Sequence, residues 1–314
     1  MKKRFSPFVK FTCLGQGKLE GIFWDKGGFL KATILIPVYN EEKTLPEVLS
    51  KLEKLNIEKE IIIINDGSTD RTKEILEELV QKNRNIRVIH HEKNQGKGKA
   101  IQTGLRYSTG DIVVIQDADL EYDPFQIIEL LKGFENPGID AVFGSRFLKK
   151  NPNIYKRYLI GNKLLTFLIN LFYGTNYTDS YTCYKLIKKD VFEKLNLESS
   201  RFEIEAEISI KLKKVGAKVI EFPIDYFPRR LEEGKKIGFK DALRGFFTII
   251  KFILGGCMKG ITLVSIVVGV ISVLLAVILR IANTLGPFGI QATNLMFFAG
   301  ICFLFAIALI EYKK

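Results

Sequence analysis

Between residues 31 and 145 the chain alternates short β-rich runs with segments whose apolar residues recur at helical spacing. Near-continuous apolar strands separated by helices indicate a mostly parallel sheet covered on both faces. The expected strands are residues 32–38, 60–66, 86–92, 111–117 and 139–145. The expected helices are residues 44–55, 69–81, 97–108 and 124–134. We therefore predict an α/β fold that binds a ligand in the crevice beyond the carboxyl ends of the strands.

Two uncharged apolar runs, residues 261–279 and 293–310, follow the α/β region. Each is about as long as the roughly 20 residues that cross a bilayer as a helix. The linker between them is uncharged, whereas basic residues precede the first run and follow the second: Lys235, Lys236, Lys240, Arg244, Lys251, Lys259, Lys313 and Lys314. Because basic flanks stay in the cytoplasm, we predict an integral membrane protein with a two-helix hairpin at 261–314 and a cytoplasmic α/β domain. Two buried helices of a soluble core are the alternative.

Two further segments, residues 155–173 and 240–258, mix basic side chains with many Leu, Ile and Phe residues. This composition is typical of helices that lie in the plane of a membrane interface, although ordinary core helices have it too. The predicted domains are therefore an α/β domain at 31–239 and a juxtamembrane amphipathic helix within 240–260. Residues 1–30 form an extension to which we assign no role, and no cleaved signal peptide is expected there.

The chain has a formal net charge of +12, which constrains its partners. The basic residues gather beside the apolar runs without any nucleic-acid motif, so we expect an anionic lipid surface and no nucleic acid. The cysteines are scattered without a C-x-x-C pair, which argues against a disulfide framework and a zinc site; they are Cys13, Cys183, Cys257 and Cys302. A reducing compartment is the simplest setting.

The stretch GDIVVIQDADLEYDP, residues 110–124, places Asp117, Asp119, Glu121 and Asp123 after an apolar strand. Two carboxylates about 5 Å apart repel by roughly 3 kcal/mol at an effective dielectric constant of 20. A hard divalent cation such as Mg²⁺ or Mn²⁺ would offset that repulsion and bridge to a nucleoside diphosphate. The alternative is that the acids only end a strand and cap the next helix, which is the role we expect for Asp123.

Other polar segments end the first two strands. PVYNEE supplies Pro37, Tyr39, Asn40 and Glu41 after the first strand. NDGSTDRT follows the second strand, and its Asp66 could accept hydrogen bonds from a base or a ribose. Ser68 or Thr69 is expected to be the N-cap of the helix that follows.

Six ordered motifs identify a resemblance to a known family: TILIPVYNEE, IIIINDGSTDRT, NQGKGKAIQTG, GDIVVIQDADLEYDP, FGSRF and FPRRLEEGKKIGFKDALR. Together they resemble the family 2 glycosyltransferases, in particular the dolichol-phosphate mannose synthase and polyprenyl-phosphate glycosyltransferase branch. The resemblance runs from about residue 33 to residue 244 and implies the Rossmann-like GT-A fold.

The resemblance also implies roles for residues at matching positions. Nucleotide contacts would come from Pro37, Tyr39, Glu41, Asp66, Lys97 and Asp117. The metal and the diphosphate would be held by Asp117, Asp119 and Glu121. Donor or acceptor phosphates would be bound by Arg146, Arg229, Lys235 and Lys236, with Arg230 as the competing choice beside Arg229. The expected catalytic residues are Asp117, Asp119, Arg146 and Arg229. The third acid is often Gln in relatives, so Glu121 departs from the common pattern.

The expected reaction is metal-dependent, inverting transfer of a hexose from a nucleotide-sugar of the GDP-mannose or UDP-glucose type to polyprenyl or dolichyl phosphate. Only His90 and His91 are present, and we expect both to be ordinary strand residues. A lipid phosphate monoester, with a second pKa of about 6, already carries a nucleophilic oxygen at neutral pH and needs no general base. The alternatives are transfer to a saccharide acceptor and a non-catalytic membrane scaffold with a vestigial nucleotide-sugar site. A homo-oligomer is compatible with the sequence.

Overall fold

The computed structural model describes residues 30–83, 85–152, 155–229 and 238–253, together with residues 269, 300 and 301. The chain divides into two compact units, Met1–Ile249 and Ile250–Lys314. The first unit contains all the strands of the sheet and the candidate site.

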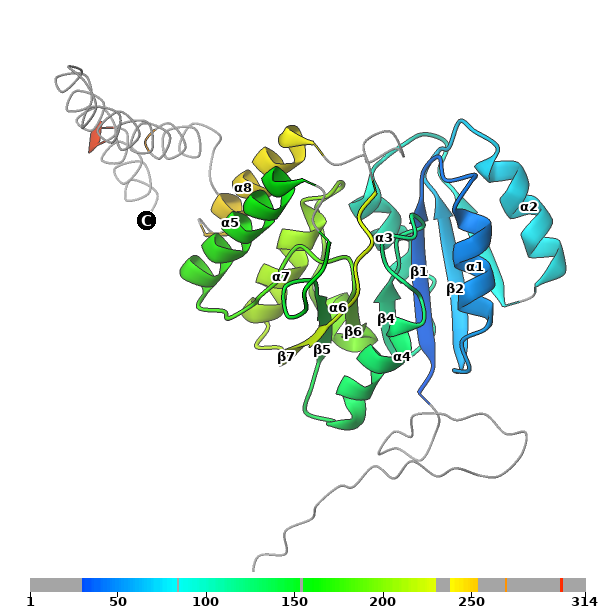
Figure 1. The fold of residues 1–314 in the computed structure, drawn as a ribbon, viewed down its shortest axis with the longest axis horizontal. Helices are drawn as coiled ribbons and strands as arrows, with labels where there is room; N and C mark the ends of the chain where they lie inside the picture. Colours follow the sequence, from blue (N-terminus) through cyan, green and yellow to red (C-terminus); the bar gives the residue numbers. More distant parts are fainter. Residues whose placement is uncertain are drawn as a thin grey trace, which may run out of the picture. The chain divides into compact units, whose positions relative to one another are not determined.

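A seven-stranded sheet forms the centre of the first unit (Figure 1). Its strands are β1 (Ala32–Val38), β2 (Lys59–Asn65), β3 (Ile86–His90), β4 (Ile112–Ile115), β5 (Ala141–Ser145), β6 (Lys185–Lys188) and β7 (Val219–Pro223). They are ordered β3-β2-β1-β4-β6-β5-β7. Strand β6 pairs antiparallel with β4 and β5, and the other neighbours pair in parallel. The sheet is therefore mostly parallel, as predicted.

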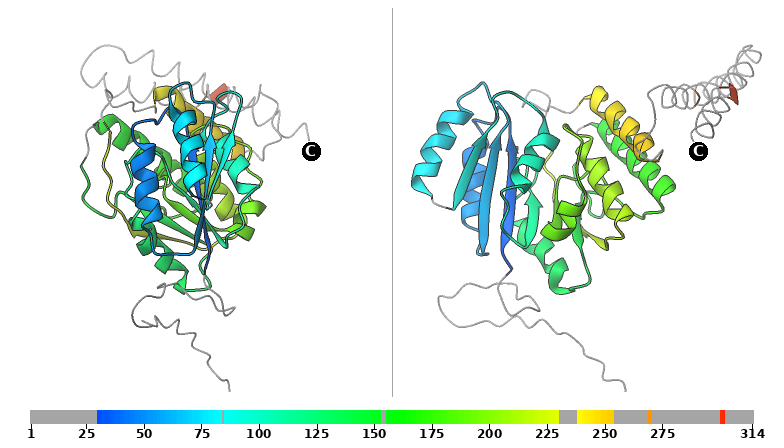
Figure 2. Two further views of the ribbon diagram at one scale, coloured as in Figure 1. Left: turned by 90° about the vertical axis from the view of Figure 1, so that its right-hand side faces the viewer. Right: turned by 180° about the vertical axis from the view of Figure 1, so that it is seen from behind.

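Helices cover the sheet on both sides; α1 and α3 lie on opposite faces (Figure 2). The helices are α1 (Leu45–Glu53), α2 (Thr72–Lys82), α3 (Lys97–Leu105), α4 (Gln126–Leu131), α5 (Lys156–Tyr173), α6 (Lys189–Lys194), α7 (Ile204–Lys214) and α8 (Phe239–Ile253), with a 3-10 turn η1 (Lys132–Glu135). Helix α1 buries Leu45, Val48, Leu49 and Leu52, which share one face at helical spacing. The periodicity in the sequence therefore corresponds to the buried face.

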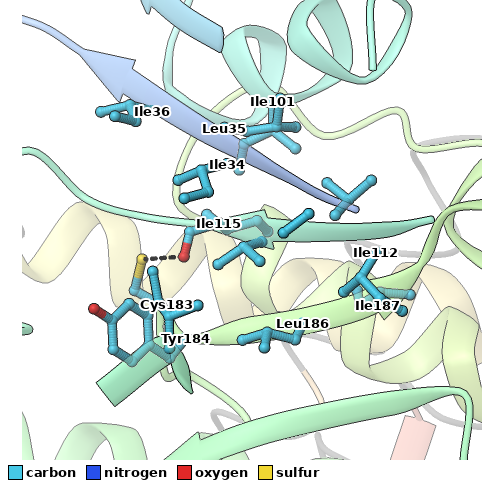
Figure 3. Packing of buried hydrophobic residues seen from close by; sticks show 14 of the residues in the cluster. Ile34, Leu35, Ile36, Ile101, Ile112, Ile115, Cys183, Tyr184, Leu186 and Ile187 are labelled. Carbon is cyan, nitrogen blue, oxygen red and sulfur yellow. Dashed lines mark hydrogen bonds between the residues drawn. The ribbon is translucent and has the colours of Figure 1, made fainter. Parts of the chain in front are cut away.

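The core lies where β1, β4 and β6 run side by side (Figure 3). Ile34 and Leu35 of β1, Ile115 of β4 and Leu186 of β6 are each fully buried. All four residues of β4 are buried, which explains why that strand reads as an uninterrupted apolar run. This packing holds the end of β4 at a fixed position, from which the acidic stretch continues.

All five predicted strands and all four predicted helices are present; β1 has the predicted ends, and the others differ at one end or both. Strand β4 stops at Ile115, so Gln116 and Asp117 belong to the loop. Helix α2 begins at Thr72, and the prediction that Ser68 or Thr69 caps it is wrong. Instead, Asn40 donates its backbone N–H to Ser68 Oγ (3.0 Å), and its side chain bonds Thr69, which ties the β1 loop to the β2 loop.

Strands β6 and β7 were not predicted. Strand β6 reads KLIK, and its Lys185 is fully buried, so the sequence lacks the apolar run that marks the other strands. Strand β7 is only partly buried and reads VIEFP, which is short and contains a charge and a proline. Both strands form because the sheet supplies hydrogen-bonding partners, which local sequence does not show.

The two amphipathic segments are helices, α5 and α8, which run side by side as far as Ile249 (Figure 1). Tyr173 donates its hydroxyl hydrogen bond to the carbonyl oxygen of Ile249 (2.7 Å). Within the described part of the chain, no helix combines the length and apolar character needed to cross a bilayer. The predicted runs 261–279 and 293–310 lie outside the described residues, apart from residues 269, 300 and 301, and residues 1–29 lie outside them as well.

Candidate active site

Residues 116–123, here called the acidic loop, begin where β4 ends, at the carboxyl edge of the sheet. Gln116 is fully buried; Tyr184 donates to its Oε1 (2.7 Å), and its Nε2 donates to the carbonyl of Asp117 (2.9 Å). Leu120 has a left-handed backbone (φ 60°), and Glu121 donates its backbone N–H to Asp119 Oδ1 (3.1 Å). The loop is therefore a tight turn built on a buried anchor, which holds its carboxylates in place.

Asp117 and Asp119 are partly buried in this loop, and their negative charges interact unfavourably. Burial, together with the charges of Asp117 and Glu121, raises the pKa of Asp119 to about 7, and Arg229 opposes the rise. Such crowded carboxylates are the oxygen-donor environment that a hard divalent cation suits. Among the described residues, however, no three acidic, histidine or cysteine side chains already form a metal-binding cluster.

Lys97, the first residue of α3, lies beside Asp117. Its Nζ is 2.8 Å from Asp117 Oδ1 and 3.0 Å from Oδ2, and it is 2.9 Å from Glu205 Oε1. Burial works against its charge, but Asp117 and Glu205 outweigh that effect and hold the pKa of Lys97 well above its ordinary value. Lys97 is therefore a buried cation held directly against the acidic loop.

Arg229 bridges three parts of the site. Its Nη2 and Nη1 donate to the two carboxylate oxygens of Glu41 (2.8 and 3.2 Å), and its Nε donates to the backbone carbonyl of Asp119 (2.6 Å). Glu121 accepts from the Arg229 backbone N–H (2.8 Å) and from the Tyr226 hydroxyl (2.7 Å). Both oxygens of Glu121 thus already hold the 226–229 segment, which favours a positioning role for Glu121 over direct metal ligation.

Asp66, at the end of β2, is also engaged. Its Oδ1 accepts from the backbone N–H of Gln95 (2.9 Å) and contacts His91 Nδ1 (2.7 Å), while Oδ2 accepts from Gly96 N–H (2.7 Å). His91 Nε2 in turn contacts Thr103 Oγ1 (3.0 Å). The prediction that His91 is an ordinary strand residue is wrong, because the residue lies beyond β3 and joins Asp66 to α3.

Arg146 lies in the loop after β5 and is paired with Asp179. Its Nε and Nη2 donate to the two oxygens of Asp179 (2.7 and 2.8 Å), a bidentate pair in which Asp179 is fully buried. Burial opposes the charge of Arg146, but Asp179 outweighs burial and holds its pKa well above the ordinary value. A cavity of about 220 Å³ adjoins Arg146, and it is lined by Arg146, Phe147, Lys149, Lys150, Asn151, Tyr155, Tyr158, Leu159, Asn162, Lys163, Tyr226 and Pro228.

The sequence was compared with models of known protein families. The model of glycosyl transferase family 2 matches residues 33–196, which span β1 to α6. The chain belongs to glycosyltransferase family 2. The predicted resemblance and the predicted enzyme class are thereby confirmed.

Relatives of this family 2 glycosyltransferase include two proteins named for dolichyl-phosphate chemistry. A dolichol-phosphate mannosyltransferase of Pyrococcus furiosus is 30% identical over 71% of this chain and 64% of its own length. A UDP-N-acetylglucosamine–dolichyl-phosphate N-acetylglucosaminyltransferase of Methanococcus voltae is 34% identical over 66% of this chain and 91% of its own length. The chain thus spans somewhat under two thirds of the first relative and most of the second.

A solved structure shares the fold. Glucosyl-3-phosphoglycerate synthase from Mycobacterium tuberculosis, crystallised with Mn²⁺, uridine diphosphate and phosphoglyceric acid, superposes with a TM-score of 0.57 at 18% identity. The match covers 74% of this chain and 80% of the synthase. At this identity the similarity supports the GT-A-like α/β fold alone.

Most of the residues that the family motifs singled out gather at one edge of the sheet. Glu41, Lys97, Asp117, Asp119 and Arg229 are joined by direct contacts or by their charges. Pro37 is in β1 and Tyr39 follows that strand, both partly exposed, while Asp66 reaches the same edge through Gly96. Arg146 lies instead beside the basic cavity, and Lys235, Lys236 and Arg230 lie outside the described residues.

Residues of the site that were not predicted include Glu205, Lys185, Asp179, His91 and Tyr226. Glu205 belongs to the run EIEAE, where Glu205 and Glu207 are both buried on α7. Buried acids on a helix require partners, so these acids, which alternate with apolar residues at the start of α7, were a usable signal. For Lys185 and Asp179 no comparable local signal exists.

Proposed function

We propose that this enzyme transfers a hexose from a nucleotide-sugar to a polyprenyl phosphate, using a divalent cation, at the cytoplasmic face of a membrane. The names of the two archaeal relatives support a dolichyl-phosphate acceptor, and the crystallised synthase with Mn²⁺ and uridine diphosphate supports a metal-bound nucleotide. The observation that carries the proposal is the basic cavity beside Tyr226, whose hydroxyl bonds the acidic loop.

The donor half of the site consists of the acidic loop and the cations around it. The residues fit a divalent cation, because Asp117 and Asp119 present crowded oxygen donors. Burial, together with the charges of Asp117 and Glu121, raises the pKa of Asp119 to about 7. When bound, the cation would neutralise the diphosphate and stabilise it as a leaving group. Lys97, at Asp117, and Arg229, at the backbone carbonyl of Asp119, add fixed positive charge beside the loop, and Glu41 holds Arg229 in position.

The acceptor half is the cavity of about 220 Å³ after β5. Arg146, Lys149, Lys150 and Lys163 supply positive charge, while Tyr155, Tyr158, Tyr226 and Phe147 supply aromatic surface. A phosphate monoester attached to an apolar chain matches this combination. Asp179 fixes the guanidinium of Arg146 in one orientation, so the charge is preorganised before the acceptor arrives.

The proposed reaction is a single displacement. A phosphate oxygen of the acceptor attacks the anomeric carbon, the bond from that carbon to the nucleoside diphosphate breaks, and the configuration inverts. The leaving diphosphate keeps the bonding electrons, and Lys97 and Arg229 stabilise its charge. No protein base is required because a phosphate monoester with a second pKa of about 6 is mostly dianionic at neutral pH.

The sequence and the surface of α5 support the proposed membrane attachment. Ile160, Leu164, Phe167 and Leu171 recur along one face of α5, and each side chain is 54–65% exposed. An exposed apolar stripe of this kind, with Lys163 beside it, suits insertion at the headgroup level. This stripe and the cavity share α5, so an interfacial α5 would bring the cavity to the depth of a lipid phosphate.

The test uses the full chain in detergent with polyprenyl phosphate, Mn²⁺ or Mg²⁺, and labelled UDP-glucose, GDP-mannose and related donors. We expect label to enter the organic phase with at least one donor. Asp119→Asn should abolish transfer while the protein stays folded. Asp111→Asn is the matched control, because Asp111 lies at the opposite end of β4, where it accepts from the backbone N–H of Lys31 (3.0 Å).

Other outcomes would point to the alternatives. Label that accumulates only in a water-soluble saccharide would indicate a saccharide acceptor. Failure to bind any nucleotide-sugar in calorimetry would favour a non-catalytic scaffold. Full activity of Asp119→Asn would contradict the proposed donor site.

A further inference from the structure

Four charges of alternating sign form a row that leads away from the acidic loop; Asp117 is partly exposed and the other three side chains are buried. Asp117 contacts Lys97, Lys97 Nζ is 2.9 Å from Glu205 Oε1, and Lys185 Nζ is 2.5 Å from Glu205 Oε2. The side chains of Lys97, Glu205 and Lys185 are only 9%, 5% and 0% exposed. Solvent therefore screens these interactions weakly, and each charge depends on its neighbours.

The row joins four separate elements. Lys97 is on α3, Glu205 on α7 and Lys185 on β6, while Asp117 follows β4. Hydrogen bonds between α3 and the segment before α7 hold these two elements together. Lys99 donates its backbone N–H to Ser200 O (3.0 Å), and Gln102 donates its side-chain N–H to Ser199 O (2.7 Å). Glu205 is thus held within reach of Lys97 by the backbone as well as by charge.

Within the row, Lys97 is shared between two carboxylates. A cation that binds Asp117 must compete with Lys97 for the same oxygens. Glu205 attracts the ammonium of Lys97 and thereby weakens its ion pair with Asp117. Lys185 reduces this attraction because its positive charge neutralises Glu205. Burial lowers the pKa of Lys185 while Glu205 opposes this, so Lys185 and Glu205 depend on one another.

We propose that Glu205 and Lys185 are positioning residues that set how strongly Lys97 holds Asp117, and thereby how readily Asp117 accepts a divalent cation and its diphosphate. The proposal rests on the donor site described under the proposed function. Under this proposal Glu205 and Lys185 bind neither the cation nor the nucleotide, and they act only through Lys97.

The two residues should shift cation binding in opposite directions. In Glu205→Gln, Lys97 pairs with Asp117 alone, so Mn²⁺ binding should weaken. In Lys185→Met, Glu205 attracts Lys97 more strongly, so Mn²⁺ binding should tighten. Because Glu205 acts through Lys97, the double variant Lys97→Met with Glu205→Gln should bind Mn²⁺ like Lys97→Met alone.

The experiment measures Mn²⁺ binding to the full chain in detergent by electron paramagnetic resonance, with UDP and with GDP. We expect the dissociation constant to change by about fivefold or more in each single variant, the low end of usual coupling between sites. Lys211→Met is the matched control: Lys211 pairs with buried Glu207 on the same helix (2.6 Å), outside the row. It should alter thermal stability without altering Mn²⁺ affinity.

Glu205→Gln leaves Lys185 buried without its carboxylate and can unfold the protein. The double variant Glu205→Gln with Lys185→Met removes both members of that pair and should weaken Mn²⁺ binding as Glu205→Gln does. Shifts of the same sign in Glu205→Gln and Lys185→Met, or additive effects of Lys97→Met and Glu205→Gln, would overturn the inference. If the wild-type chain binds neither Mn²⁺ nor nucleotide, the proposed function itself fails.

Discussion

The carboxyl group of Asp119 has a pKa of about 7, whereas an unfolded aspartate has 3.8. Burial is the main cause, the charges of Asp117 and Glu121 add to it, and Arg229 opposes it. The loop therefore stores unfavourable charge at neutral pH in the absence of a cation. A bound cation would relieve this unfavourable charge, whereas in the cation-free protein the charge lowers the stability of the folded state.

This environment predicts a pH dependence. Between about pH 4 and pH 7 the folded state binds more protons at Asp119 than the unfolded state does, so its contribution to the free energy of unfolding falls as pH rises. In EDTA, the Tm of the wild type should fall relative to that of Asp119→Asn from pH 5 to about pH 7 and then stay level. Mn²⁺ should remove the difference at pH 8. Parallel Tm curves for the two proteins would contradict the assigned environment.

At the scale of the element, α3 matters because its first turn carries Lys97. Gly98 lies so close to the segment before α7 that a Cβ atom there would be 2.4 Å from the carbonyl oxygen of Ser199. Real Cβ atoms do not approach backbone that closely, so a larger residue must displace the start of α3. The glycine therefore allows the start of α3 to pack directly against the segment that leads into α7.

We expect Gly98→Ala to destabilise the protein by about 1–3 kcal/mol, as overpacking does, and to raise the donor KM. Gly161→Ala is the control, because Gly161 is also helical but a Cβ there meets nothing within 4 Å. That change should leave activity intact and stabilise α5 by about 0.5–1 kcal/mol. Tm and donor KM of both variants check the prediction, and equal behaviour would refute it.

For the molecule as a whole, the proposed insertion of the apolar stripe of α5 at a lipid surface makes a prediction about the acceptor. Replacing Leu164 and Phe167 with Ser should raise the KM for polyprenyl phosphate in anionic vesicles by about tenfold or more, because full burial of each apolar side chain contributes about 1.5–3 kcal/mol and about 1.4 kcal/mol is a factor of ten. The KM for the nucleotide-sugar should not change. Val80→Ser, on the exposed side of α2, is the control. An unchanged acceptor KM would argue against an interfacial α5.

The amino-acid sequence by itself determined β1 to β5, α1 to α4 and the acidic loop after β4. These features are local: a buried parallel strand needs a continuous apolar run, and a covering helix needs apolar residues every three or four positions. The order of the motifs was likewise sufficient for the family. Strand β6 escaped prediction because its buried Lys185 is neutralised by Glu205 on another element.

Only the tertiary structure decided which charge meets which. Arg229 pairs with Glu41, 188 residues away, instead of being available solely to phosphate, and Arg146 is held by Asp179. Lys97 is shared by Asp117 and Glu205. Any of the chain's acids could neutralise these cations, because electrostatic attraction depends on distance in space and not on position in the sequence. The packing of α3, α7 and the sheet selects the partners, since only it sets the distances over which buried charges interact.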